Sequence, residues 1–99
     1  MHNQLRFLGL LNRGGKLTFG PGVEDHIDRY DLLIVASDSS RAQKAKEKAI
    51  RLNIPVVSCF SKEEIGEPLG YDELSLVGIR GKKEAKAFLA KGDKHEEEQ

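Results

Sequence analysis

The amino-acid sequence predicts an α/β protein, a three-layer α/β/α sandwich with a four-stranded mixed sheet. Two observations carry this prediction. The longest unbroken apolar run, residues 32–36, has the length and branched side chains of a strand buried on both faces. Segments with helical spacing also alternate along the chain with short apolar or alternating segments, as expected where helices pack against a sheet.

The first third of the chain predicts a helix, a strand and a second helix. Leucines recur at helical spacing over residues 3–12, with Asn3 as the expected N-cap, and two glycines end the helix. Residues 16–19 alternate polar and apolar side chains, which indicates a short half-buried strand. Residues 23–29 follow a Gly-Pro-Gly turn and carry acids early, which favours a short helix.

The rest of the chain predicts three further helices separated by two strands. Ser40 and Gln43 have the spacing of a capping box for a helix to residue 52, which Asn53 ends. A strand over residues 56–60 leads to a second capping box at 61–64 and a short helix. Residues 74–79 predict a strand and residues 82–91 the last helix. Residues 1–92 are therefore expected to form one domain, and 93–99 a disordered acidic tail.

Composition and charge restrict the function. No apolar run approaches the roughly 20 residues of a membrane-spanning helix, so we expect a cytoplasmic protein without a membrane partner. The chain has 16 bases and 16 acids, but the last eight residues hold one base and four acids. Residues 1–91 therefore keep 15 bases against 12 acids, and their separation along the chain permits a basic face for RNA.

No residue pattern predicts catalysis or a cofactor. The glycines before Lys16 suggest a phosphate loop, but Leu17 stands where such a loop needs Ser or Thr. His26 has no nucleophile placed beside it, and Cys59 is expected to be a small buried hydrophobe. Asp38 and Ser40 follow the central strand, where they either meet a ligand or cap the next helix. We expect no enzyme, metal or small-molecule cofactor.

Several segments in order resemble a known family. They are Leu8-Gly9-Leu10, Asn12-Arg13, Gly15-Lys16, Gly20, and residues 33–38, 54–56 and 61–66. Their order and spacing are similar to those of the L-seven-Ae and L-thirty-e type of RNA-binding ribosomal proteins, and most to its small bacterial YlxQ-like members. The resemblance covers residues 5 to about 90. It implies an α/β/α sandwich that recognises kink-turn RNA, a sharply bent duplex.

The resemblance also implies which residues contact RNA. In the family a glycine, an asparagine, a glutamate and a lysine of the second helix do so, and here these positions hold Gly20, Gly22, Val23 and His26. Lys62 matches a lysine that contacts RNA, and Ser40 stands where some members have an acid. The expected RNA-binding set is Arg13, Lys16, Gly20, Gly22, His26, Ser40 and Lys62.

Two functional hypotheses follow. In the first, the protein is a non-catalytic ribosomal or ribosome-associated protein whose partner is structured RNA, either a kink-turn or ribosomal RNA. Ribosomal or translation-factor proteins are further expected partners. In the second, it is a protein-interaction module that kept the fold and lost kink-turn readout, with acids near Asp25 and Asp28 or at 71–73 facing a basic protein.

Overall fold

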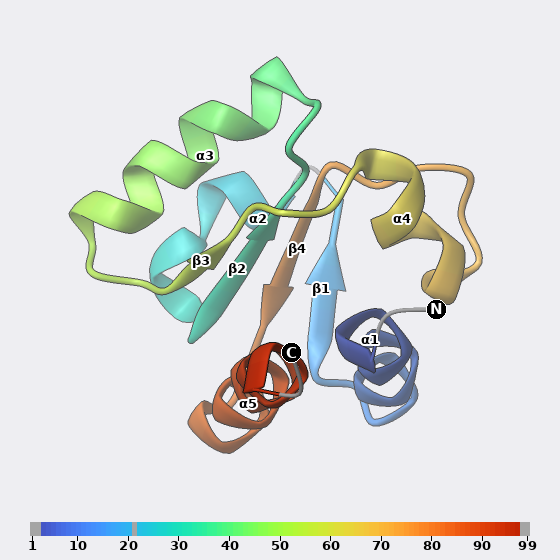
Figure 1. The fold of residues 1–99 in the computed structure, drawn as a ribbon. Coiled ribbons are helices and arrows are strands. Elements are labelled where there is room, and N and C mark those ends of the chain that lie inside the picture. The colour runs from blue at the N-terminus through green and yellow to red at the C-terminus, as the bar shows by residue number, and fades with distance from the viewer. Residues whose placement is uncertain (1–2, 21, 98–99) are drawn as a thin grey trace.

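The computed structural model describes residues 3–20 and 22–97, with side chains to residue 92 (Figure 1). Five α-helices and four strands alternate along the chain, joined by two short 3-10 helices. The helices are α1 (Asn3–Arg13), α2 (Gly22–Asp25), α3 (Ser40–Arg51), α4 (Lys62–Gly66) and α5 (Lys82–Glu97), with η1 (Ile27–Arg29) and η2 (Glu67–Leu69). The strands are β1 (Leu17–Phe19), β2 (Leu32–Val35), β3 (Val56–Val57) and β4 (Leu76–Ile79).

The four strands form one mixed sheet in the order β1-β4-β2-β3. β4 is antiparallel to both of its neighbours, whereas β3 is parallel to β2. β1, β2 and β3 therefore run in one direction, and their carboxyl ends share one edge with the start of β4. We call this the carboxyl edge. The opposite edge, where β1 and β2 begin and β4 ends, is the amino edge.

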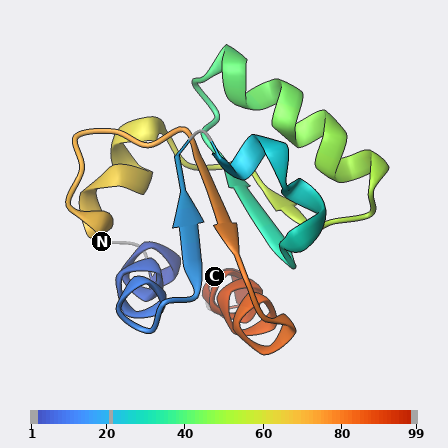
Figure 2. The same ribbon diagram turned by 180° about the vertical axis from the view of Figure 1, so that it is seen from behind.

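Helices cover both faces of the sheet, which confirms that part of the predicted fold (Figures 1 and 2). Alternate residues of β2 enter two separate core clusters. Leu32 and Ile34 pack with α1, α4 and α5, and Leu33 and Val35 pack with α2, η1 and α3. Within residues 3–20 and 22–97, no helix combines the length and apolar character that crossing a membrane requires.

Two of the predicted helix signals are confirmed. The hydroxyl of Ser61 accepts a hydrogen bond from the amide of Glu64, whose carboxylate accepts one from the Ser61 amide in return. Asn53 takes the left-handed conformation expected after α3, with φ of 61°. The predicted cap of α3 is wrong by one residue, because Ser39 has the extended cap geometry and accepts from the Ala42 amide at 3.2 Å.

Several element boundaries also differ from the prediction. The helix expected over 23–29 divides into α2 and η1, and Asn3 is the first helical residue of α1 rather than its cap. β3 has two residues instead of five, because its ladder with β2 stops at the pair of Ile34 and Val57. The backbone of α5 continues to Glu97, since Lys and Glu favour helix. Residues 98–99 lie outside the described residues, and the disordered tail over 93–99 stays a prediction.

Candidate functional site

Three helices begin at the carboxyl edge, close to the ends of the three parallel strands (Figure 1). α2 follows β1 through the Gly20 turn, α3 follows β2, and α4 follows β3. The chain that enters β4 completes the edge, because the amide of Leu74 donates to the carbonyl of Lys62 at 3.0 Å. The carboxyl edge thus collects Gly20, Gly22, Ser40 and Lys62 from three separate segments.

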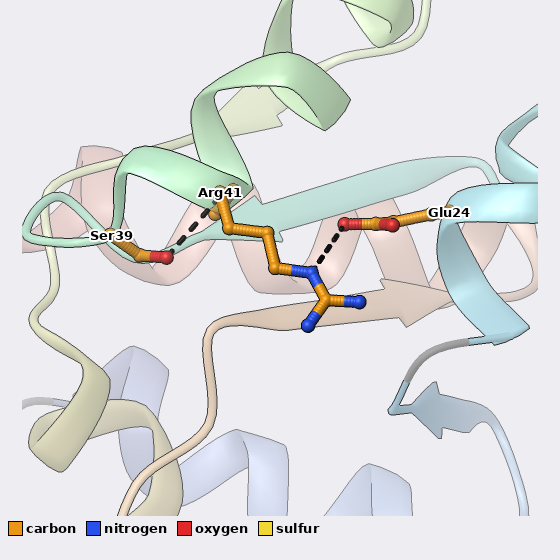
Figure 3. Close-up of polar contacts among 4 residues, drawn as sticks. Glu24, Ser39 and Arg41 are labelled. Carbon is orange, nitrogen blue, oxygen red and sulfur yellow. Dashed lines mark hydrogen bonds and ion pairs between the residues drawn. The ribbon is translucent and has the colours of Figure 1, made fainter.

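An ion pair joins two of these segments (Figure 3). Arg41 Nε lies 3.6 Å from a carboxylate oxygen of Glu24, which links α3 to α2. The side chain of Arg41 is 75% exposed, so this pair is worth at most about 1 kcal/mol and leaves the guanidinium accessible. Both residues line a pocket of about 200 Å³, together with Gly20, Glu73 and residues 74–76.

Asp38 connects the loop after β2 to the start of α4. Its carboxylate accepts a hydrogen bond from the Lys62 amide at 2.9 Å. Beside it, the amide of Ser37 donates to the carbonyl of Phe60 at 2.8 Å. Asp38 therefore caps the start of α4 and not that of α3. Ser40 is exposed in the first turn of α3, and Ser39 is the residue that caps this helix.

The two glycines of this edge present bare backbone. Gly20 has a φ of 108°, which L side chains rarely adopt, and no atom lies within 4 Å of where a Cβ would stand. The space beside Gly22 is open in the same way. Val23, at the position of the family's glutamate, is fully buried and cannot contact a ligand. His26 is exposed beyond the end of α2 and makes no side-chain hydrogen bond to cap η1.

Arg13 and Lys16 do not join this group. Leu17 pairs with Ile79 and Phe19 with Val77, so the start of β1 lies at the amino edge and Gly20 at the carboxyl edge. The carbonyl of Lys16 accepts a hydrogen bond from the amide of Arg80 at 2.9 Å, which continues the ladder beyond β4. The expected RNA-binding set, which places Arg13 and Lys16 near Gly20 and Gly22, is therefore divided between the two edges of the sheet.

An acidic groove borders the carboxyl edge. Glu63, Glu67, Asp72 and Glu73 line it around Tyr71, whose side chain is 50% exposed. The Tyr71 ring packs edge-on against Phe19 at a centroid distance of 5.1 Å, which fixes its position. The acids at 71–73 were expected as a patch. The contribution of Glu63 in α4 and Glu67 in η2 was missed, because their spacing shows only that they share a face of these helices.

Two candidates remain, a metal site and the thiol of Cys59. Among the side chains of residues 3–20 and 22–92, no three His, Cys, Asp or Glu are placed to hold a metal ion. Cys59 is exposed rather than buried as expected, because residues 58–60 leave the sheet after β3. Partial burial of the sulfur and the nearby Glu64 carboxylate raise the pKa of the Cys59 thiol.

Fold and site together define a small α/β sandwich domain whose polar edge is built from loops and helix starts. No family model matches the chain, and no curated protein matches it. Among solved structures it is similar to a Bacillus halodurans protein described as having unknown function, with a TM-score of 0.82 and 24% sequence identity. The match covers 94% of this chain and 99% of that one, and it shows the shared fold.

Proposed function

We propose that this protein is a non-catalytic RNA-binding protein of the ribosome or translation apparatus, working in the cytoplasm. A single observation carries the proposal. Gly20, Gly22, Ser40 and Lys62, which the family resemblance implies as RNA contacts, gather at the carboxyl edge although up to 42 positions separate them in the sequence. This convergence supports a binding surface for structured RNA there, with ribosomal or translation-factor proteins as further partners.

The chemistry of the edge suits the backbone of a sharply bent RNA. The open space beside Gly20 and Gly22 lets a phosphate approach main-chain atoms that a side chain would shield. Arg41 and Lys62 add positive charge on either side. Glu24 pairs with Arg41, and Asp38 accepts a hydrogen bond from the Lys62 amide. Glu73 is exposed beside the pocket that Glu24 and Arg41 line and opposes a phosphate there, which is one reason to expect weak binding.

The same geometry predicts how binding differs from the family pattern. Gly22 has no side chain with which to read a base edge, and Val23 is buried in the core. Recognition must then depend on phosphates and on RNA shape, which supply affinity without base readout. We expect weaker binding that discriminates less between kinked and unkinked RNA.

The experiment is a titration of the full chain with a labelled kink-turn RNA and an unkinked duplex of equal length, at several salt concentrations. Affinity should favour the kinked form and fall as salt rises. Lys62→Ala should lower the slope of log affinity against log salt by about one, because one phosphate contact is lost. The control is Lys44→Ala, an exposed lysine in the middle of α3. Equal weak binding to both RNAs, or none, would overturn the proposal.

A second function is favoured by the acidic groove. An exposed aromatic ring surrounded by carboxylates suits a lysine- or arginine-rich segment of a protein partner. If the chain is a protein-interaction module, a labelled lysine-rich peptide should bind it, and Tyr71→Ala should weaken that binding. Lys62→Ala should leave the peptide affinity unchanged, since Lys62 is not among the residues that line the groove.

A further inference from the structure

The amino edge carries a group of exposed bases from three segments. Lys16 precedes β1 and lies beside Arg80, whose amide donates to the Lys16 carbonyl at 2.9 Å. α5 begins two residues after Arg80, so its first turn adds bases to the same edge. The exposed bases in these segments are Arg13, Lys16, Arg80, Lys82, Lys83 and Lys86.

Two acids share this edge with the six bases, and both contact the backbone at the start of α5. The carboxylate of Asp31 accepts a hydrogen bond from the Gly81 amide at 2.9 Å. The carboxylate of Glu84 lies against Gly81, where a Cβ would clash with it. Among residues with described side chains, the ion pair between Arg41 and Glu24 is the only one found, and it is remote from this edge. The bases therefore keep their charge available.

Two of these lysines stand where the fold disfavours them. Lys82 and Lys83 open a 16-residue helix, and the positive end of the helix dipole repels cations in the first turn. The first turn of α5 also holds Glu84, and α4 likewise opens on a lysine, Lys62, before its acids. Lys82 and Lys83 are both exposed, so their ammonium groups are accessible to a ligand of opposite charge.

We propose that the amino edge is a second RNA-binding surface, on which Lys16, Arg80, Lys82 and Lys83 hold backbone phosphates. This inference rests on the proposed function and deepens it, because it gives the protein two contact surfaces at opposite ends of one sheet. The longest dimension of the molecule is 35 Å. The two RNA segments held would therefore lie within about this distance of one another, and the contacts at the amino edge would not depend on sequence.

The test compares two double variants of the full chain that remove the same charge. Lys82→Gln with Lys83→Gln alters the amino edge, and Lys44→Gln with Lys48→Gln alters the exposed face of α3. Binding of an unkinked RNA duplex is measured at several salt concentrations. The first variant should lower the slope of log affinity against log salt by about two, and the second should leave it unchanged. Equal losses, or no loss in the first variant, would overturn the inference.

Thermal unfolding and the RNA titrations together distinguish a folding defect, a failure of the proposed function and a failure of this inference alone. Thermal unfolding of the Lys82→Gln, Lys83→Gln variant should show a midpoint equal to or above that of the unchanged protein, so lost binding cannot reflect lost folding. If the unchanged protein binds neither RNA, the proposed function and this inference both fail. If it binds RNA and responds to Lys62→Ala but not to the amino-edge variant, the carboxyl edge acts alone and this inference fails.

Discussion

The carboxylate of Asp31 accepts a hydrogen bond from the backbone amide of Gly81, at 2.9 Å and across 50 residues of sequence. Asp31 directly precedes β2 and Gly81 directly precedes α5, so this bond ties the entry of the central strand to the start of the last helix. The Asp31 amide also donates to the carbonyl of Ile79 at 2.9 Å. One residue thus fixes where β4 ends and α5 begins.

Replacing Asp31 should destabilise the fold. Asp31→Ala removes a charged acceptor from a part-buried amide, and we expect a loss of about 1.5 kcal/mol in the free energy of unfolding. Urea denaturation of the unchanged protein and of the Asp31→Ala variant measures this difference in the free energy of unfolding. Asp28→Ala is the matched control, because Asp28 is exposed, and its effect should stay within about 0.5 kcal/mol.

The packing of Tyr30 over the sheet predicts a second effect. A Cβ on Gly78 would lie 2.7 Å from ring carbons of Tyr30, so Gly78→Ala should cost about 1–3 kcal/mol of stability. Gly14→Ala, where the nearest atom is 3.7 Å away, should be nearly neutral. Denaturant melts should also show that Gly78→Ala costs less in a Tyr30→Ala background. An additive result would contradict the clash.

The corrected cap of α3 gives a third prediction. Ser39→Ala removes the oxygen that accepts from the Ala42 amide and should cost about 1 kcal/mol. Ser40→Ala should change stability by less than about 0.5 kcal/mol, since Ser40 is exposed and already helical. Thermal or urea unfolding of the pair distinguishes them, and a larger loss from Ser40→Ala would restore the cap predicted from spacing.

The reactivity of Cys59 gives a fourth. Because burial and Glu64 raise the pKa of its thiol, less thiolate is present at pH 7 to 8 than in the unfolded chain, and iodoacetamide should react more slowly. An ordinary thiol has a pKa of about 8.5. A plot of the reaction rate of Cys59 against pH should have its midpoint above that value. Glu64→Gln should lower the midpoint, while glutamine keeps the capping box with Ser61. An unchanged midpoint would exclude Glu64 as a cause.

Local signals in the sequence predicted most of the elements. Each of these signals depends only on a few neighbouring residues. The structure contains three of them as predicted, namely the apolar strand β2, the capping box at Ser61 and the left-handed Asn53. The cap of α3 was misplaced because Ser39 and Ser40 are adjacent serines, and spacing alone does not decide between them. The length of β3 depends on how far β2 extends beside it, which no local pattern encodes.

The candidate site was less predictable, because it depends on pairing between distant strands. The resemblance grouped Lys16 with Gly20, which follows it by four residues. β1 spans the sheet between them, so the two residues emerge at opposite edges. The bases of the amino edge come together only because β4 returns antiparallel beside β1, bringing Arg80 to Lys16. Sequence spacing gives no sign of that pairing.

The strand order also determines when the sheet can be completed during synthesis. β1 is bonded to the sheet through β4 alone, and β4 follows the other three strands of this sheet in the sequence. A nascent chain that stops before residue 76 holds β2 and β3 as an isolated parallel pair, which is marginal in water. The strand β1 must therefore wait for β4 before it joins the sheet, and the four-stranded sheet is complete only after residues 76–79 have been made.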